Sequence, residues 1–248
     1  MADYKFPTEM VELPSKGYFY VEGHPLSEGK VEVKYMTAKE EDILTSQNLI
    51  QQGTVIEVLL QSLIVDKAID IDDMLIGDKN AIMVASRVLG YGKDYEFTYD
   101  GEEQTVDLSK LEPRDIDFSK FTRGTNKFSF ELPNSERIIV FKLLDGKDEK
   151  KIDTEVKSKQ KISKEQSSEL TTRLKHIILS VDGKSEKSYI NNFVDNEFLS
   201  VDSLAFRKHL TSITPDVDMS TTVVNSAGKE IEVTIPFTLR FFWPSAGV

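Results

Sequence analysis

The stretch that decides the fold class is "VEVKYMTAKEEDILTSQN", residues 31–48, because the hydrophobic period changes inside it. Residues 31–35 alternate apolar and polar side chains, which is typical of a β-strand with one buried face. Thr37 follows, and Glu40 stands three residues after it, the spacing of a capping box at the start of an α-helix. A strand followed at once by a helix with its own start signal predicts a chain that mixes both kinds of element.

The neighbouring sequence extends this module in both directions. Upstream, residues 18–21 are aromatic or β-branched and predict the partner strand of a first β-hairpin. Downstream, residues 53–63 carry an apolar stripe at helical spacing. Asp78 is placed to cap a third helix, which Gly90 or Gly92 would end. The prediction is a first module of three short helices packed on a hairpin.

Three later stretches have the alternation and the turn residues of β-hairpins. Their predicted turns lie at residues 100–101 (Asp-Gly), 133–134 (Pro-Asn) and 227–228 (Ala-Gly). Two helices are predicted before the last hairpin, the second capped by Ser200 or Asp202. The first and last of these hairpins both follow a helical segment and both have glycine at the turn. Either a duplicated helix-plus-hairpin unit or the common rules of turns would explain this likeness.

Residues 147–175 differ from the rest of the chain in composition. They contain nine Lys or Arg and six Asp or Glu, with large apolar residues spaced far apart. This pattern predicts an exposed, charged, partly helical linker, with a basic partner-binding arm as the alternative. The predicted fold class is therefore α+β, with β-hairpins packed against short helices in two halves, residues 1–146 and 176–248, joined by that linker.

Composition excludes several classes of function. The chain has no cysteine, which rules out disulfides, thiol catalysis and thiolate zinc sites. Its formal net charge of −11 repels phosphate backbones, so nucleic-acid binding is not expected. The first residues lack the basic and apolar regions of a signal peptide, and no apolar run approaches the ~20 residues of a membrane span. These features predict a soluble cytoplasmic protein.

The motifs that carry chemistry are incomplete. "VDGKS", residues 181–185, matches the end of a phosphate-binding loop, but Ile178 stands where the first glycine is required, so a helix ending at a glycine is favoured. A run of aspartates lacks the spacing of a calcium loop and is more typical of helix caps and a solvated loop. No hydrolase or dinucleotide-binding glycine motif is present. The sequence therefore predicts no catalytic residue, no cofactor and no metal, and favours a non-enzymatic protein. The aspartates are Asp66, Asp70, Asp72, Asp73 and Asp78, and the scattered histidines are His24, His176 and His209.

The carboxyl-terminal stretch, "TIPFTLRFFWPSAGV", contains the only tryptophan. If the strand continues through it, Phe237, Leu239 and Phe241 share one face and belong to the core. Aromatic residues left near a surface are the types that dominate protein–protein contacts. For Trp243 a partner contact and a core position are equally open. The predicted partner-binding residues are Phe242, Trp243 and Pro244.

Five segments together resemble the T4-type bacteriophage baseplate family, whose small proteins build the central hub of the contractile tail. The resemblance implies a morphogenesis factor that promotes hub assembly by transient, non-covalent binding to baseplate hub proteins. It implies action in the cytoplasm of the infected host cell and absence from the mature virion; the alternative is a structural hub subunit retained there. The segments are "ELPSKGYFY" (12–20), "MTAKEEDILTSQNLIQQG" (36–53), "LIGDKNAIMVASRVLGYGKDYEF" (75–97), "SVDG" (180–183) and "EVTIPFTLRFFWP" (232–244).

This chain departs from that family at its hairpins. Many relatives carry C-x-x-C pairs there that look like small zinc knuckles, whereas the turn at residues 224–228 contains no cysteine. The resemblance therefore implies that apolar packing replaces the metal. The candidates for this packing are Val223, Val224, Ile231 and Val233.

Overall fold

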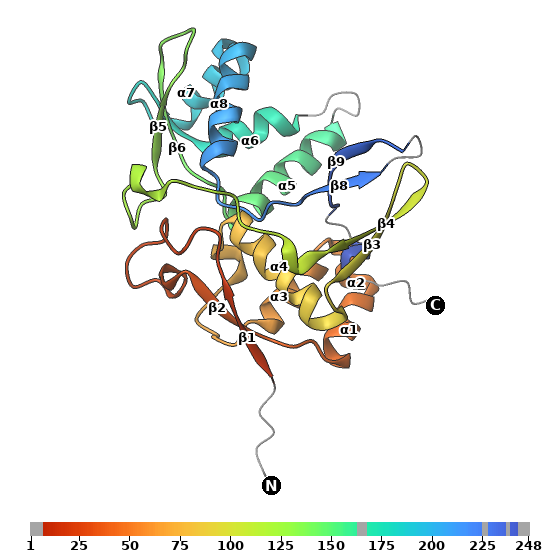
Figure 1. Cartoon of the computed structure of the whole chain (residues 1–248). Coiled ribbons are helices and arrows are strands. Elements are labelled where there is room, and N and C mark those ends of the chain that lie inside the picture. The colour runs from red at the N-terminus through yellow and green to blue at the C-terminus, as the bar shows by residue number, and fades with distance from the viewer. Residues whose placement is uncertain (1–6, 163–167, 225–227, 237–238, 243–248) are drawn as a thin grey trace.

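A computed structural model describes residues 7–162, 168–224, 228–236 and 239–242 (Figure 1). The fold is α+β, as predicted: small antiparallel sheets are packed among helices. The strands are β1 (Thr8–Glu12), β2 (Lys30–Lys34), β3 (Asp94–Tyr99), β4 (Glu102–Asp107), β5 (Phe128–Glu131), β6 (Ile138–Phe141), β7 (Ile178–Val181), β8 (Ser220–Val224) and β9 (Glu230–Thr234). The α-helices are α1 (Ala38–Thr45), α2 (Gln47–Gln52), α3 (Val55–Leu63), α4 (Ile76–Tyr91), α5 (Gly146–Ile162), α6 (Glu169–Ile177), α7 (Lys187–Asn192) and α8 (Ser200–Ile213). Short helical turns are η1 (Pro25–Glu28), η2 (Ile71–Asp73), η3 (Leu108–Lys110), η4 (Phe118–Lys120), η5 (Phe193–Glu197, a π-helix) and η6 (Leu239–Phe242).

The change from strand to helix in the deciding stretch is confirmed. β2 leads into α1, and the main-chain amide of Thr37 donates to the Glu40 carboxylate over 2.9 Å. The predicted partner strand is wrong: β2 pairs with β1, whereas residues 18–21 form turns. Gly17 has a φ of 69°, and a Cβ there would lie 2.4 Å from the carbonyl oxygen of Ser27. The chain folds back on itself there, so Phe19 enters the core from a turn.

Helix α4 begins earlier than the sequence predicts. Its first residue is Ile76, so Asp78 lies inside the first turn and is not the N-cap; that prediction is wrong. The Asp78 side chain is fully buried and accepts hydrogen bonds from the Ser15 amide (2.9 Å), the Ser15 hydroxyl (2.6 Å) and the Tyr20 hydroxyl (2.6 Å). A carboxylate at this point also faces the positive end of the helix dipole. The helix ends before Gly92, one of the two predicted stops.

The predicted hairpins are present. β3 and β4 are joined by Asp100 and Gly101, with φ angles of 50° and 80°, the left-handed backbone that a two-residue turn requires. β5 pairs with β6 as predicted, but β7 adds a third strand where the sequence predicts a helical stripe through Ile178. β8 pairs with β9, although part of the predicted turn lies outside the described residues. Of the packing candidates, Val223 is buried and Val224 is exposed.

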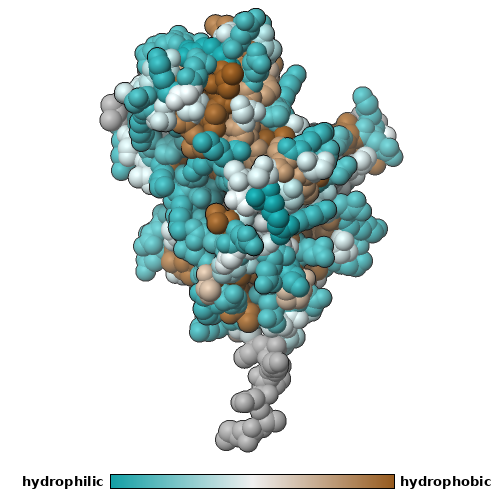
Figure 2. Space-filling model, turned by 90° about the vertical axis from the view of Figure 1, so that its left-hand side faces the viewer, coloured by the Kyte–Doolittle hydropathy of each residue, from teal (hydrophilic) through white to brown (hydrophobic). Residues whose placement is uncertain are grey.

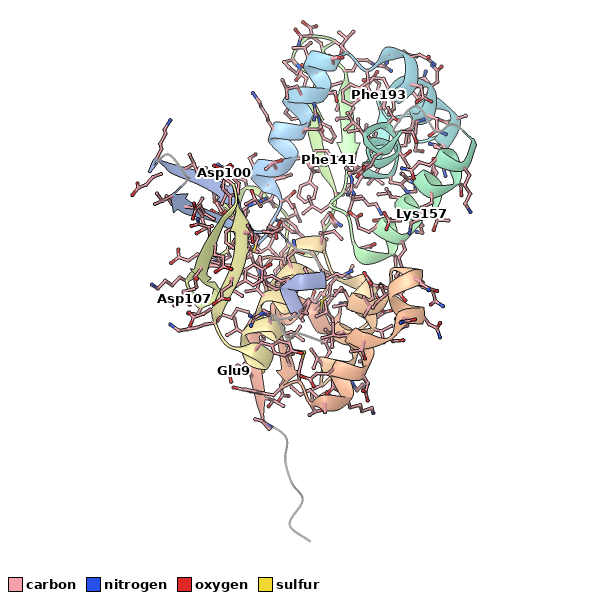
Figure 3. All side chains as sticks on the ribbon, turned by 90° about the vertical axis from the view of Figure 1, so that its right-hand side faces the viewer. Glu9, Asp100, Asp107, Phe141, Lys157 and Phe193 are labelled. Atoms are coloured by element: carbon pink, nitrogen blue, oxygen red, sulfur yellow. The ribbon has the colours of Figure 1, made fainter. Side chains whose placement is uncertain are left out.

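Residues 147–175 are not an exposed linker. α5 and α6 occupy most of this segment and pack on the rest of the molecule, with Ile152 and Leu174 buried. Lys147 and Lys150 at the start of α5 form ion pairs with Asp73 and Asp72 of η2. Most of the charges lie on the outer side, where Figure 3 shows Lys157. Of the spaced apolar residues that suggested a linker, Ile152, Val156 and Leu174 form the buried face of two packed helices, whereas Leu170 is exposed.

The two predicted halves share one hydrophobic core that runs from Leu13 to Phe242. Short main-chain contacts join them: the Arg114 amide donates to the Asp216 carbonyl (2.8 Å), and the Asp218 amide donates to the Glu112 carbonyl (2.8 Å). Figure 1 shows β8 and β9 returning beside β3 and β4. The predicted boundaries at 146 and 175 therefore fall near helix ends, and packing continues across them.

Candidate protein-binding surface at the start of helix α8

The closing aromatic run belongs to the core as far as the structure describes it. Phe241 and Phe242 are fully buried in η6; their rings are perpendicular with centroids 5.4 Å apart, and the Phe241 ring lies 5.0 Å from that of Tyr95. The prediction of a partner contact at Phe242 is thus corrected. A strand sends neighbouring side chains to opposite faces, whereas a tight helical turn separates them by about 120°, so both can point inward. Trp243 and Pro244 lie outside the described residues.

The fragment "VDGKS" forms a turn between β7 and α7. Asp182 and Gly183 have φ angles of 50° and 78°, and the Asp182 carboxylate accepts from Arg137 and from the Ile138 amide at 2.8 and 2.9 Å. The sequence predicted the end of a helix here, and this prediction is wrong, because the strand β7 precedes the turn. Nearby groups already use the polar atoms of Asp182, and the turn leads into α7 without a phosphate cradle.

The histidines and aspartates singled out in the sequence make separate structural contacts. His24 stacks on Tyr20 and His209 on Phe130, while Nε2 of His176 lies 3.0 Å from the Glu155 carboxylate. Asp70 accepts from the Asp72 amide and caps η2, as predicted for this run. Among the residues that the structure describes, no group of three or more His, Cys, Asp or Glu side chains is placed to hold a metal ion.

Around Asp78 the structure assembles titratable groups that the sequence did not connect. Burial raises the pKa of Asp78 to about 6, although hydrogen bonds from Ser15 and Tyr20 oppose this, and Asp216 adds a like charge. Burial and the neighbouring Asp78 raise the pKa of Tyr20 well above its ordinary value. Such shifts occur at active sites and also in buried structural networks. Ser15 and Asp78 are fully buried, and Ser15 and Tyr20 both donate to Asp78, so the cluster serves to fix the loop before η1 onto α4.

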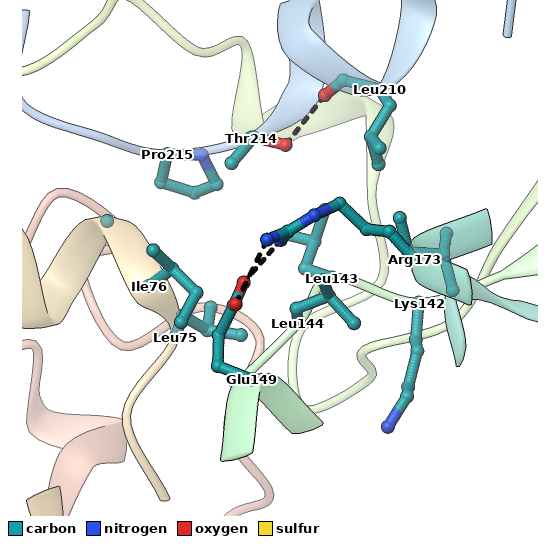
Figure 4. A pocket seen from close by; sticks show the side chains of 12 residues that line it. Leu75, Ile76, Lys142, Leu143, Leu144, Glu149, Arg173, Leu210, Thr214 and Pro215 are labelled. Atoms are coloured by element: carbon teal, nitrogen blue, oxygen red, sulfur yellow. Dashed lines mark hydrogen bonds and ion pairs between the residues drawn. The ribbon is translucent and has the colours of Figure 1, made fainter. Parts of the chain in front are cut away.

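A small apolar cavity of about 190 Å³ lies where the two halves meet (Figure 4). Its walls come from the start of α4, the segment 142–144 that follows β6, α5, α6 and the end of α8. Arg173 donates to both oxygens of Glu149 at this cavity, one of the bonds measuring 3.1 Å, so the charges there are paired with each other. The lining is mainly aliphatic and offers no nucleophile and base in contact. This cavity is better explained as imperfect packing at a junction.

Helix α8 begins with an apolar surface that no described part of the chain covers. Leu199 precedes the helix and is 51% exposed, while Val201 and Leu204, three residues apart on one helix face, are 53% and 45% exposed. We call Leu199, Val201 and Leu204 the α8 corner. Figure 2 shows a band of apolar side chains on the upper half of one face, the half built from β5–β7 and α5–α8, whereas the lower half has separate spots.

Asp202 holds this corner in place. It accepts from the main-chain amide of Asn134 (2.9 Å), the Asn134 side-chain amide (2.8 Å) and the Ser135 amide (3.1 Å). Burial alone would raise the pKa of Asp202, but these hydrogen bonds outweigh burial and lower it. The sequence predicts Ser200 or Asp202 as the N-cap; the structure places Leu199 there and Asp202 inside the first turn, so this prediction is wrong.

The sequences at the starts of α4 and α8 can be aligned so that Asp78 matches Asp202. Gly77 and Asn80 then match Val201 and Leu204. A Cβ on Gly77 would lie 1.9 Å from the carbonyl oxygen of Pro215, and the Asn80 side chain donates to Asp216 over 2.9 Å. In α4, this helix face is therefore covered by the chain itself. In α8 the same face is apolar and exposed.

The α8 corner was not predicted from the sequence, because the sequence predicted the helix and its cap without indicating which helix face is buried. A usable signal is present in "LSVDSLAF", residues 199–206, where apolar residues fall on more than one helix face. Ser203 and Phe206 take the buried face, which leaves Val201 and Leu204 outside.

Comparisons with protein-family models, with curated proteins and with solved structures found no match. The resemblance of five segments to the T4-type baseplate family therefore stays a prediction. No helix in the described ranges is long and apolar enough to cross a lipid bilayer.

Proposed function

We propose that this chain is a non-enzymatic protein that acts by binding other proteins through the α8 corner. On the resemblance described above, we further propose that its partners are baseplate hub proteins of a T4-type phage tail. It would promote hub assembly in the infected cell through transient, non-covalent contacts. The competing proposal within the same family is a structural hub subunit that remains in the virion.

The observation that carries protein binding is the α8 corner itself. Three large apolar side chains within six residues are each about half exposed, and the matched face of α4 is covered. Burying a Leu or Val side chain fully is worth about 1.5–3 kcal/mol, so completing the burial of all three contributes roughly 3 kcal/mol before association costs. A contribution of this size, added to that of the surrounding contacts, is consistent with reversible binding.

The test uses purified chains and individually expressed hub proteins of a T4-like phage. The double variant Val201→Ser/Leu204→Ser is compared with the wild type by analytical ultracentrifugation and by binding titration. We expect one hub protein to bind the wild type and the double variant to bind at least tenfold more weakly.

The matched control is Val224→Ser, which removes an equally exposed apolar side chain from a different surface. Equal weakening by the control, or unchanged binding by the double variant, would contradict the α8 corner. Binding to none of the hub proteins would contradict the phage assignment. Mass spectrometry of purified tails beside infected-cell lysate then separates an assembly factor, found only in the lysate, from a retained subunit.

A further inference from the structure

Among the residues that the structure describes, strand β1 is paired on one side only. The Leu13 amide donates to the Gly29 carbonyl (2.8 Å), and the Tyr35 amide donates to the Pro7 carbonyl (3.1 Å). Alternate residues of an antiparallel strand bond to the same neighbour, so Glu9 and Val11 also direct their main-chain groups toward β2. The main-chain groups of Thr8, Met10 and Glu12 point the other way, and no main-chain bond within the described ranges reaches them. Such an edge is a template for another strand.

A groove of about 420 Å³ lies along this strand. The consecutive residues 9–14 all line it, which indicates that the strand presents its edge to the groove, because a cavity on one face would be lined by alternate residues. The far wall is a stripe on α4 at helical spacing, which spans about 12 Å, the length of roughly four extended residues. The stripe consists of Ala81, Val84, Ala85, Val88 and Leu89.

The charges beside the groove select the kind of strand that fits. Three charged side chains line the groove: Glu9, Glu12 and Lys16. The Lys16 ammonium lies over the ring of Phe118, 5.5 Å from its centroid. Glu9 and Glu12 are exposed, and neither forms an ion pair with any described residue, so the groove has a net negative charge. Figure 3 shows Glu9 at the lower part of the molecule, below the hairpin β3–β4. A second copy pairing through the same edge would bring the two sets of glutamates together, and like charges across strands are destabilising. A strand with Lys or Arg beside its apolar residues has the complementary charge.

We propose that the groove between β1 and α4 binds an extended, basic segment of a partner protein as an additional strand on β1. The main-chain groups of Thr8, Met10 and Glu12 pair with the segment, and its apolar side chains alternate into the groove against α4. Glu9 and Glu12 lie on opposite faces of β1, so the basic side chains of the segment lie beside the glutamate on the face opposite its apolar side chains, and the other glutamate attracts them from a longer distance. Main-chain pairing supplies affinity and the groove supplies side-chain selection. This surface lies on different elements from the α8 corner and does not depend on the phage assignment.

The experiment measures fluorescence anisotropy with the labelled peptide Lys-Val-Lys-Val-Lys-Val-Lys and the full chain. We expect saturable binding to the wild type. N-methylation of alternate peptide amides on the paired edge should weaken it at least tenfold, because strand pairing needs those donors. Replacing every Lys of the peptide with Glu should do the same. Ala85→Leu, which narrows the groove, should weaken binding while leaving the circular dichroism spectrum unchanged.

The charge variant is Glu9→Lys/Glu12→Lys, with Glu102→Lys/Glu103→Lys on strand β4 as the matched control of equal charge change. We expect at least tenfold weaker binding for the first and less than twofold for the control. No binding by the wild type, equal binding of the N-methylated peptide, or equal loss in both charge variants would each overturn the proposal. A wild-type dimer that the peptide does not dissociate would overturn it in favour of a second copy.

Discussion

Helices α4 and α8 begin with the same arrangement and end up in different surroundings. Each has a leucine at the N-cap and a fully buried aspartate in the first turn, and each is followed by a hairpin. Asp78 accepts mainly from hydroxyl groups, whereas Asp202 accepts from amides. Both aspartates tie a helix start to a distant loop, so each fixes where its helix begins.

The difference in partners changes the electrostatics. The pKa of Asp78 is raised by burial, with Asp216 as a neighbouring like charge, whereas hydrogen bonds from Asn134 and Ser135 lower that of Asp202. The two helix starts also differ in how far the rest of the chain covers them: the N-cap residue of α4, Leu75, is buried, whereas that of α8, Leu199, is exposed. The start of α4 is an internal contact between segments of the chain, whereas the start of α8 is exposed and accessible to other molecules.

The largest expected effect is that of Asp78→Ala. The Ser15 and Tyr20 hydroxyls would lose their shared acceptor inside the core, and each buried unsatisfied group costs about 1–3 kcal/mol. We expect the free energy of unfolding to fall by roughly 3–5 kcal/mol in urea titrations. A loss below about 1 kcal/mol would mean that water or rearrangement replaces the carboxylate, and that the cluster does not fix α4.

The pH dependence of Asp78 should be nearly as large and have a characteristic sign. Its pKa is about 6 in the folded chain and 3.8 ordinarily, so the folded chain holds this proton more tightly. The stability contributed by Asp78 should therefore decrease as the pH rises from about 4 to about 6, by roughly 3 kcal/mol, and stay constant outside that window.

The measurement is the difference in unfolding free energy between the wild type and Asp78→Asn at each pH, which cancels the other titrating groups. Asp202 provides the contrast, since its lowered pKa means that its contribution is present above pH 4 and is lost only as the pH falls further. A difference that increases with pH between 4 and 6 would show that the pKa of Asp78 is not raised.

Gly77→Ala tests the covered helix start. The added Cβ would overlap the carbonyl oxygen of Pro215, so the contact between α4 and residues 215–216 must open. We expect a loss of about 1–3 kcal/mol, measured by thermal unfolding. The matched variant is Val201→Ala in α8, which meets no such contact. Similar effects at both positions would remove the distinction between the two helix starts.

Local rules predicted much of the fold. The capping pair at Thr37 and Glu40 and the Asp-Gly turn of β3–β4 depend on neighbouring residues, and both are present. The failures depend on contacts between distant residues. Residues 18–21 have strand composition, but the close approach of Gly17 to Ser27 turns the chain there. The composition of α5 predicts an exposed segment, but its residue Ile152 is fully buried.

The candidate site was harder to predict than the fold. The tail carried the conspicuous aromatic residues, yet Phe242 is buried by a helical turn that alternation along a strand does not anticipate. The α8 corner consists of ordinary aliphatic residues. Their exposure depends on the absence of a covering segment within the described chain, and a covering segment is a property of the tertiary structure.

Asp202→Ala should have a smaller effect than Asp78→Ala. The amides of Asn134 and Ser135 lie in a partly exposed turn, where water can replace the lost acceptor. We expect a loss of about 1–2 kcal/mol in urea titrations. Amide hydrogen exchange should increase in the turn between β5 and β6 and stay unchanged in the loop before η1. A loss equal to that of Asp78→Ala would show that the two aspartates are equivalent in the fold.

The smallest expected effect on stability is that of Val201→Ser/Leu204→Ser. Both side chains are about half exposed and neither lies in the shared core, so we expect unfolding free energy to change by no more than about 0.5 kcal/mol per substitution. Differential scanning calorimetry of the isolated chain measures this directly. A stable double variant separates surface presentation from folding, which a binding test of the α8 corner requires. A steep fall in melting temperature would instead mean that these side chains support α8 against its neighbours, and the contrast with Gly77 and Asn80 would no longer indicate an open binding face.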